Sequence, residues 1–321
     1  MPREHAPDAE SLDHLLTWVQ DGVVARRQLR ALRFTHGDLE RMLRRKELVR
    51  VVDGVFVDHT GPPTRAQREW VAVLAHWPSA LWGLSALPSP PPRAVVDVAI
   101  AHDRTVVPVA GVRAHRMPDL AGRVDWRAAP PRVMLEHALV DAASAGRDDV
   151  AATYGLLADV VQTRRTSARQ VAEVLASRRV AGKRLLLAML DDLATGACSV
   201  LEREWLRVER AHGLPVGRRQ APGASGGRPT ARDVHYADHG VVVELDGRAF
   251  HDNARARDLD GRRDLDARAE EDLVSVRLTY GLVFSTPCST AASIARLLHR
   301  GGWAGSMRPC PNCPSTVDLL S

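Results

Sequence analysis

The feature that most restricts how this chain can fold is the segment Val241–Asp246, in which three consecutive valines precede acid, leucine and acid. Alternate side chains of a β-strand point to opposite faces, so this pattern predicts a strand with Glu244 and Asp246 on one face and Leu245 on the other. Two carboxylates beside an apolar strand repel each other and lose hydration unless a cation neutralises them. The alternative is that both acids are solvated at a strand end, before an Asp-Gly turn.

A partner strand is predicted at residues 232–237, where a third acid lies. If the two strands turn at His239 and Gly240, Asp233 stands opposite Asp246 and on the same face as Glu244. Carboxylate oxygens with room for water are ligands that suit Mg²⁺ or Mn²⁺. We therefore expect Asp233, Glu244 and Asp246 to bind one of these metals.

Two further residues are candidates for the same chemistry. Glu202 follows Ser199 by three positions at the start of a helix predicted to run to His212, where Gly213 ends it. It either completes a capping box with Ser199 or joins the acids if the helix packs beside the strands. His251, five residues after Asp246, either assists proton transfer to or from a metal-bound water or is simply an exposed loop histidine.

The N-terminal 60 residues have a different pattern. Helical spacing of apolar residues predicts helices at 12–19 and 24–32, and Thr35 with Asp38 forms a capping box for a third helix that ends near Lys46. Strands at 48–52 and 55–57 flank Asp53-Gly54, which predicts a two-residue type I′ hairpin. The order of three helices and a hairpin is typical of a winged helix.

Charge supports a polyanionic partner for this region. Residues 23–52 hold nine basic and three acidic side chains, a net charge of +6, whereas residues 233–272 hold twelve acids and six arginines, a net charge of −6. On the third helix, basic residues lie opposite an apolar stripe of Leu39, Met42 and Leu43. The expected DNA-binding residues are Arg41, Arg44 and Arg45 on this helix and Arg50 in the hairpin. The alternative is a solvated helix face.

The whole pattern predicts an α+β multidomain protein. We expect a winged helix at 1–60, a small α/β unit at 61–145, a helical connector at 146–197, an αβββαβ core resembling restriction endonucleases at 198–300, and a tail rich in Cys and Pro at 301–321. Within these segments, helices are predicted at 79–87, 255–272 and 290–300. A second capping pair, Ser167 and Gln170, is predicted in the connector.

The spacing of the four cysteines does not predict a set of disulfide bonds. The N-terminus has no signal-peptide pattern and no apolar run reaches the roughly 18 residues of a membrane span, so we expect a cytoplasmic protein with reduced thiols and no membrane partner. Cys310 and Cys313 form one CxxC pair, but a tetrahedral zinc site needs two more ligands. Because Cys198, Cys288 and His299 lack paired spacing, the sequence argues against zinc at Cys310 and Cys313.

The sequence lacks the motifs of several other enzyme classes. There is no glycine-rich phosphate loop, no GxSxG elbow and no HExxH pair. These absences argue against nucleotide-binding, serine-hydrolase and metalloprotease functions.

Two resemblances fit these patterns. The N-terminal stretch GVVARRQLRALRFTHGDLERMLRRKELVRVVDGVFVDH, with SALWGLSAL after it, resembles the winged-helix domain of AbiEi-type antitoxins of type IV toxin–antitoxin systems. That resemblance implies a DNA-binding autoregulator with a cognate toxin as partner. Residues 199–298 carry LEREWLRVERAHGLP, GRRQ, RDVHY, VVVELDGRAFH and RDLDGRRD in order, and this set is similar to the Vsr-like domain of very short patch repair endonucleases, within the PD-(D/E)xK nuclease fold.

The second resemblance implies a role for each candidate acid. Asp233 matches the first metal-binding aspartate, Glu244 and Asp246 match the second acidic motif, Glu202 matches the helix glutamate, and His251 matches the histidine after the Asp-Gly turn.

One departure bears on activity. The broad nuclease pattern has lysine where Asp246 stands, and the only lysines of the chain, Lys46 and Lys183, lie far upstream. Vsr-like relatives manage without that lysine and use histidine and hydrated metal instead.

The sequence therefore supports three hypotheses. The first is a magnesium-dependent endodeoxyribonuclease, a hydrolase that binds duplex DNA through its winged helix and holds metal through its acids. The second is an antitoxin-type transcriptional regulator, in which an inactive nuclease-fold domain serves homodimerisation or binding of a toxin. The third is a structural helical adaptor, against which the ordered acidic set argues.

Overall fold

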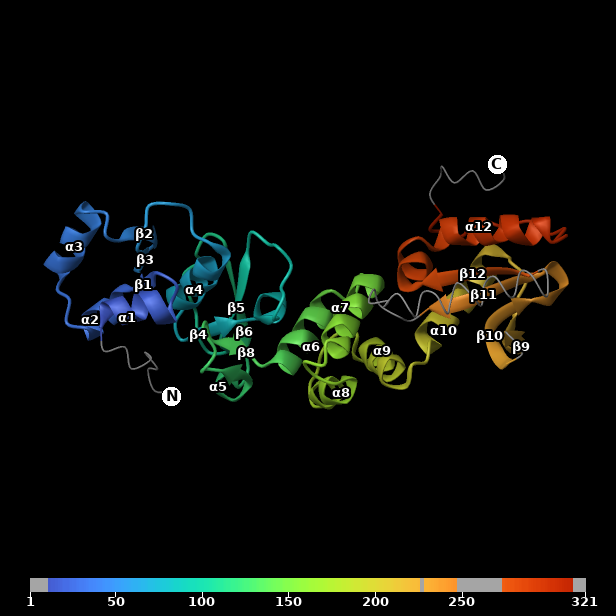
Figure 1. The fold of residues 1–321 in the computed structure, drawn as a ribbon, viewed down its shortest axis with the longest axis horizontal. Helices are drawn as coiled ribbons and strands as arrows, with labels where there is room; N and C mark the ends of the chain where they lie inside the picture. Colours follow the sequence, from blue (N-terminus) through green and yellow to red (C-terminus); the bar gives the residue numbers. More distant parts are fainter. Residues whose placement is uncertain (1–10, 226–227, 247–272, 314–321) are drawn as a thin grey trace. The chain divides into compact units, whose positions relative to one another are not determined.

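The computed structural model describes residues 11–225, 228–246 and 273–313 (Figure 1). The chain forms two compact units, Met1–Ala142 and Ala143–Ser321, and the boundary between them falls inside helix α6 (Leu135–Ala145). Helices accompany three separate β-sheets in the described residues, so the protein has a mixed α+β architecture. No helix among these residues is both long and apolar enough to cross a membrane.

The first sheet of the N-terminal unit is antiparallel, in the order β1-β3-β2. Val24 faces a core with Leu29, Leu39 and Phe56. Val23 and Ala25, the residues on either side of it, face a second core with helix α4. The sheet is therefore covered on both faces, as strand alternation requires. The elements of this part are α1 (Leu12–His14), the π-helical turn η1 (Leu15–Val19), β1 (Val23–Ala25), α2 (Arg26–Ala31), α3 (His36–Arg44), β2 (Val49–Val52), β3 (Val55–Val57) and α4 (Arg65–Ala75).

Two sequence-based predictions here are wrong in detail. The helix predicted at 24–32 begins only at Arg26, because Val23–Ala25 pairs with β3 and its three side chains are buried. The hairpin turn is not type I′, since that turn needs positive φ at both central residues and only Gly54 has it, at 76°. A bulge between Arg50 and Val52 adjusts the register of the hairpin instead. The capping box of Thr35 and Asp38 is confirmed.

The second sheet of this unit has the order β6-β5-β4-β8-β7. Its elements are β4 (Ser79–Leu81), the 3₁₀ turn η2 (Gly83–Ala86), β5 (Val96–Ala101), β6 (Val112–Met117), α5 (Leu120–Arg123), β7 (Val124–Asp125) and β8 (Arg132–Val133). The helix predicted at 79–87 is wrong. Ser79–Leu81 is a fully buried strand that pairs with both β5 and β8, and this tertiary pairing overrides local helical preference.

The C-terminal unit begins with helices α7 (Val150–Gln162), α8 (Ala168–Ala176) and α9 (Lys183–Thr195). Ser167 and Gln170 form the predicted capping box of α8. Tyr154 of α7 stacks on Tyr280, with ring centroids 3.7 Å apart, and so joins the helical layer to the π-helical turn η4 (Gly281–Ser285). The charged helix predicted at 255–272 lies outside the described residues.

The sheet of this unit has the order β12-β11-β10-β9, with β11 and β12 parallel and the other pairs antiparallel (Figure 1). Helix α10 precedes the sheet in the chain and packs against the closing helix α12. The elements are α10 (Ser199–His212), β9 (Arg218–Ser225), β10 (Arg228–Tyr236), the 3₁₀ turn η3 (Ala237–His239), β11 (Val241–Asp246), β12 (Val274–Thr279) and α12 (Pro287–Arg300).

The predicted register of β10 on β11 is wrong by two residues. Val234 pairs with Val243 and Tyr236 with Val241, so Asp233 is level with Glu244 and not with Asp246. The reason is the connection, since η3 and Gly240 form a longer turn than the two-residue turn that was expected. A shift of two leaves every side chain on its original face, so the prediction that the acids share a face does not depend on this error.

A buried polar network attaches α10 to the sheet. The Glu209 side chain is fully buried and accepts hydrogen bonds from Arg219 of β9, one of them at 3.1 Å, and from the Tyr236 hydroxyl of β10. Trp205, one turn earlier on the helix, donates its indole N–H to the Tyr236 oxygen at 3.0 Å. Burial and the adjacent Glu209 carboxylate raise the pKa of Tyr236, which therefore remains a hydrogen-bond donor. This network fixes the position of α10 along the sheet.

Replacing Arg219 with alanine leaves the buried Glu209 carboxylate without its charge partner. We expect the R219A variant to lower the free energy of unfolding of the C-terminal unit by about 3 to 5 kcal/mol. Urea denaturation of the intact chain, followed by circular dichroism, measures the change. The matched control is R218A, which removes the exposed neighbouring arginine of the same strand and should change stability by less than about 0.5 kcal/mol. Equal effects of the two variants would contradict the structural role of the network.

Candidate acidic site and basic face

The start of helix α10 is capped by Asp192, not by Glu202. The Asp192 carboxylate accepts hydrogen bonds from the backbone amides of Ser199 and Val200, at 3.2 and 3.0 Å, and from the Ser199 hydroxyl at 2.6 Å. The predicted capping box of Ser199 with Glu202 is therefore wrong, because an acid from helix α9 already binds the free amides. Glu202 is half-buried and its carboxylate is directed elsewhere.

Glu202 and Asp233 meet at the side chain of Gln220. The Gln220 amide nitrogen donates to Glu202 Oε1 at 2.7 Å and to Asp233 Oδ1 at 3.4 Å. Gln220 has a positive φ of 47°, which is unusual for a residue that is not glycine and departs from the extended backbone of β9. The structure thus brings together two acids, from α10 and β10, that are 31 positions apart in the sequence. The sequence analysis assigned no role to Gln220, although this residue ends the GRRQ motif of the Vsr-like resemblance.

The second oxygen of Asp233 is attached to β11. Asp233 Oδ2 accepts a hydrogen bond from the Leu245 backbone N–H at 2.7 Å, just beyond the last regular pair of the two strands, Val234 with Val243. Leu245 is the residue between Glu244 and Asp246, so the Asp233 carboxylate lies at the level of both acids. We call Glu202, Asp233, Glu244 and Asp246 the acidic site.

A positively charged side chain belongs to the strand next to β11, in register with Glu244. Glu244 of β11 is in register with Arg277 of β12, and neighbouring residues of paired strands share a face. Arg277 is half-buried, and sequence reasoning had not singled it out because it lies in a separate strand with no motif around it. The row across four strands is therefore Gln220, Asp233, Glu244 and Arg277.

The carboxylates of the acidic site are not gathered as tightly as ligands around an ion. In the described ranges, the group of potential ligands whose atoms all lie within 4.8 Å of one another consists of His212, Cys288, Cys310 and Cys313 instead. His251, the predicted proton-transfer residue, lies outside the described residues. Carboxylate and amide oxygens nevertheless form the donor set that Mg²⁺ and Mn²⁺ prefer.

The four predicted DNA-binding arginines are all exposed, and they differ in their partners. Arg41 forms an ion pair with Asp38 at 2.8 Å, and Arg45 forms a looser one with Glu47 at 3.7 Å. The hydrogen bond from Thr35 lowers the pKa of Asp38, so Asp38 stays charged and offsets Arg41. Arg44 and Arg50 have no acidic partner in the part of the chain that the structure describes, which makes them the stronger candidates for contact with phosphate.

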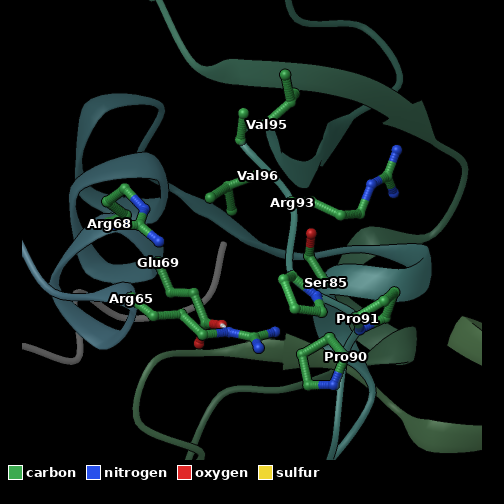
Figure 2. A pocket seen from close by; sticks show the side chains of 11 residues that line it. Arg65, Arg68, Glu69, Ser85, Pro90, Pro91, Arg93, Val95 and Val96 are labelled. Carbon is green, nitrogen blue, oxygen red and sulfur yellow. Dashed lines mark hydrogen bonds and ion pairs between the residues drawn. The ribbon is translucent and has the colours of Figure 1, made fainter.

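A pocket of about 500 Å³ lies in the N-terminal unit between α4 and the proline-rich segment 90–92 (Figure 2). Arginines line it, but protein groups already bind them, with Arg65 paired to Glu69 at 3.2 Å and Arg93 paired to Asp97 at 3.0 Å. Two of its three arginines are therefore paired with acids, the third, Arg68, donates to the Pro63 carbonyl at 3.0 Å, and we assign no chemistry to this pocket.

A scan of the sequence against models of protein families finds no match, and a search among curated proteins finds none either.

The sequence-based prediction that Asp233 is a ligand of Mg²⁺ or Mn²⁺ is tested by removing its charge. We expect D233N to weaken Mn²⁺ binding at least about tenfold, since a neutral amide replaces a charged ligand. Isothermal titration calorimetry on the intact chain measures the affinity. The control is E204Q, because Glu204 lies on α10 but pairs with Arg207 at 3.0 Å, away from Gln220. Unchanged Mn²⁺ binding in D233N would exclude Asp233 as a ligand.

Proposed function

We propose that this protein is a DNA-binding, metal-dependent endodeoxyribonuclease. In this proposal the N-terminal elements act as a winged helix and the C-terminal unit as a restriction-endonuclease-like hydrolase of the PD-(D/E)xK type. The observation that carries the proposal is the Gln220 bridge between Glu202 and Asp233, together with the attachment of Asp233 to the backbone between Glu244 and Asp246. These contacts support a proposal in which acids from α10, β10 and β11 act together at one region of the sheet.

The residues of the acidic site have distinct roles in this proposal. Asp233, Glu244 and Asp246 would hold Mg²⁺ or Mn²⁺, and Glu202 would complete the negative charge around it. Such an ion, when bound, lowers the pKa of a coordinated water and stabilises charge on a phosphodiester. Gln220 holds Glu202 and Asp233 in place beforehand, since one amide group cross-links both carboxylates.

The catalytic lysine of the broad nuclease pattern is absent from this region of the sequence. Two other residues are therefore proposed, one to supply positive charge at the phosphate and one to transfer a proton. Arg277 lies in register with Glu244, and in this proposal its guanidinium binds an oxygen of the phosphate. His251 is proposed, on the sequence alone, to exchange a proton with water. The roles of Arg277 and His251 both belong to the proposal that the substrate is DNA.

The N-terminal element order supports the DNA-binding half of the proposal. A helix, strand β1, helices α2 and α3 and the β2–β3 hairpin, with sheet order β1-β3-β2, match the order expected of a winged helix. Helix α3 buries Leu39 and exposes Arg41, Arg44 and Arg45, so a basic surface is available for a groove or for phosphates.

Cleavage should depend on both the acids and the metal. We expect the wild-type chain to nick or cut plasmid DNA in Mg²⁺ or Mn²⁺ and to lose activity in EDTA. The double variant D233A and D246A should lose at least about a hundredfold in rate, while E204Q should keep its rate. Gel analysis of supercoiled plasmid, linear duplex and mismatched duplex gives the rates. Cleavage by the double variant at the wild-type rate would eliminate the proposed mechanism.

DNA affinity should depend on Arg44 and Arg50. We expect the R44A and R50A double variant to weaken duplex binding and to lower the slope of log affinity against log salt by about two, because each arginine would neutralise one phosphate. Fluorescence anisotropy at several salt concentrations measures both quantities. The charge-matched control is the R65A and R68A double variant, on helix α4. If the two double variants behave alike, the basic face of α3 is not the DNA-binding surface.

A second function, an antitoxin-type transcriptional regulator, is favoured by one observation. No lysine follows Lys183 in the sequence, so the catalytic lysine of the broad nuclease pattern is missing, which suits an inactive nuclease fold. In that case the C-terminal unit would serve homodimerisation or binding of a cognate toxin. Sequence-specific, salt-sensitive DNA binding without any metal-dependent cleavage would identify this function.

A further inference from the structure

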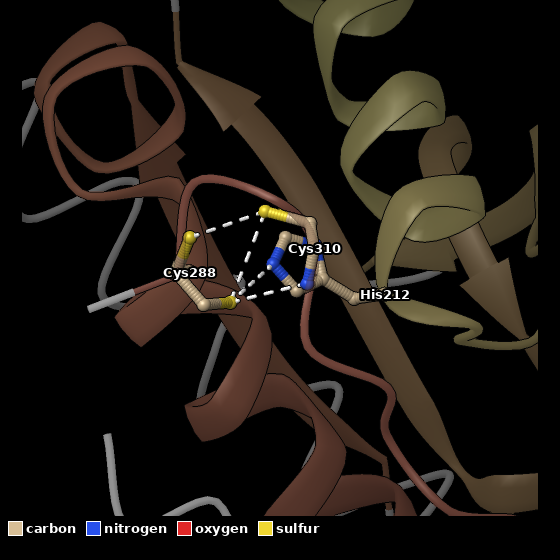
Figure 3. A group of neighbouring side chains, drawn as sticks. His212, Cys288 and Cys310 are labelled. Atoms are coloured by element: carbon tan, nitrogen blue, oxygen red, sulfur yellow. Dashed lines mark hydrogen bonds between the residues drawn. The ribbon is translucent and has the colours of Figure 1, made fainter. Parts of the chain in front are cut away.

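A second cluster of metal-binding side chains lies at the far end of α10, outside the acidic site. It contains His212, the last residue of α10, Cys288 near the start of α12, and Cys310 with Cys313 in the segment after α12 (Figure 3). His212 and Cys288 are buried, and Cys310 and Cys313 are half-buried. We call these four residues the Cys/His cluster. All four cysteines of the chain are free thiols, so no disulfide accounts for the arrangement.

Three of the six distances between the ligand atoms of the Cys/His cluster are close to the edges of a tetrahedral site, and all four atoms lie within 4.8 Å of one another. Cys288 Sγ lies 3.7 Å from Cys310 Sγ, Cys310 Sγ lies 3.8 Å from Cys313 Sγ, and Cys313 Sγ lies 3.6 Å from His212 Nε2. Tetrahedral zinc, with Zn–S near 2.3 Å and Zn–N near 2.0 Å, requires about 3.8 Å between sulfurs and about 3.5 Å between sulfur and nitrogen. A disulfide would instead require about 2.05 Å. The spacing therefore fits four ligands around one ion.

The protonation of His212 also fits a ligand. His212 Nδ1 lies 2.9 Å from the backbone oxygen of Val208, and a carbonyl can only accept, so Nδ1 carries the proton. Nε2 then presents its lone pair toward Cys313. Metal-bound histidines usually donate their other ring N–H in this way, which fixes the tautomer and the ring orientation.

The segment that carries Cys310 and Cys313 is docked on α10 by its backbone. The Arg308 N–H donates to the His212 carbonyl at 2.8 Å, and the Cys310 N–H donates to Cys313 Sγ at 3.3 Å. The Cys313 N–H closes a turn on the Cys310 carbonyl at 3.0 Å. Hydrogen bonds of this kind orient the side chains that bind a metal.

We propose that His212, Cys288, Cys310 and Cys313 bind one zinc ion with a structural role. Three thiolates and one imidazole suit Zn²⁺, and four protein ligands leave no open position for substrate or water. The ion would join three parts of the chain, namely the end of α10, the start of α12 and the segment after α12. The inference goes beyond the proposed nuclease and does not depend on it.

This proposal departs from the sequence-based expectation that argued against zinc at Cys310 and Cys313. That expectation considered Cys198, Cys288 and His299 as partners and found no paired spacing. The structure supplies Cys288 and, in addition, His212, which is 76 positions from the nearest cysteine of the cluster. His299 is not among the residues whose ligand atoms gather in this cluster, and its Nδ1 lies 2.7 Å from the Trp303 carbonyl oxygen.

Metal analysis of the purified intact chain tests the proposal without reference to DNA. We expect about one zinc ion per chain by plasma mass spectrometry after dialysis against a weak chelator. Replacing the zinc by Co²⁺ under reducing conditions should give the visible d–d absorption and the sulfur-to-cobalt charge-transfer band of a tetrahedral thiolate site. Absence of zinc together with no such cobalt spectrum would overturn the proposal. A disulfide between two of these cysteines that persists in protein prepared under reducing conditions would also overturn it.

Matched variants identify the ligands. C310S, C313S and H212N should lose most of the zinc and the cobalt charge-transfer band. C198S and H299N change the same residue types outside the cluster and should retain both. Zinc retained at the wild-type level in C310S or H212N would contradict the ligand assignment. If the ligand variants do not fold, the metal content and cobalt spectrum of the wild-type chain still decide the proposal.

Discussion

The C-terminal unit depends on one buried charge. Glu209 lies fully inside the protein, where an unpaired carboxylate would be strongly destabilising, and Arg219 and Tyr236 together satisfy it. Because these partners come from β9 and β10, the network also determines where helix α10 sits on the sheet. A misplaced helix would leave Glu209 unpaired, so the arrangement is specific as well as stable.

The position of α10 then governs both candidate metal centres. Glu202, Glu209 and His212 lie along one stripe of the helix, and the rise of 1.5 Å per residue separates Glu202 from His212 by about 15 Å. Glu202 accepts a hydrogen bond from Gln220 near the start of the helix, and His212 lies against Cys313 at its end. The acidic site and the Cys/His cluster thus share a single rigid support, which is how a structural ion could hold a functional helix in place.

The sequence predicted the local features of this arrangement better than the distant ones. Strand Val241–Asp246 and the end of α10 at Gly213 follow from side-chain alternation and glycine conformation, and both are confirmed. The register of β10 was wrong because the length of a turn depends on its three-dimensional closure. Gln220, Arg277 and His212 were missed because their relations span strands or tens of residues. Residue spacing records local periodicity, whereas these contacts arise only when the unit folds.

Helix α10 is proposed to contribute one residue to each of two metal centres, with Glu202 beside the ligands of the acidic site and His212 as a ligand of zinc. The most direct measurement is anomalous diffraction from crystals of the intact chain grown with Mn²⁺, recorded at the manganese and zinc absorption edges. We expect one manganese peak beside Glu202, Asp233, Glu244 and Asp246, and one zinc peak among His212, Cys288, Cys310 and Cys313. Peaks that lie elsewhere, or crystals with no bound metal at either position, would contradict the proposal.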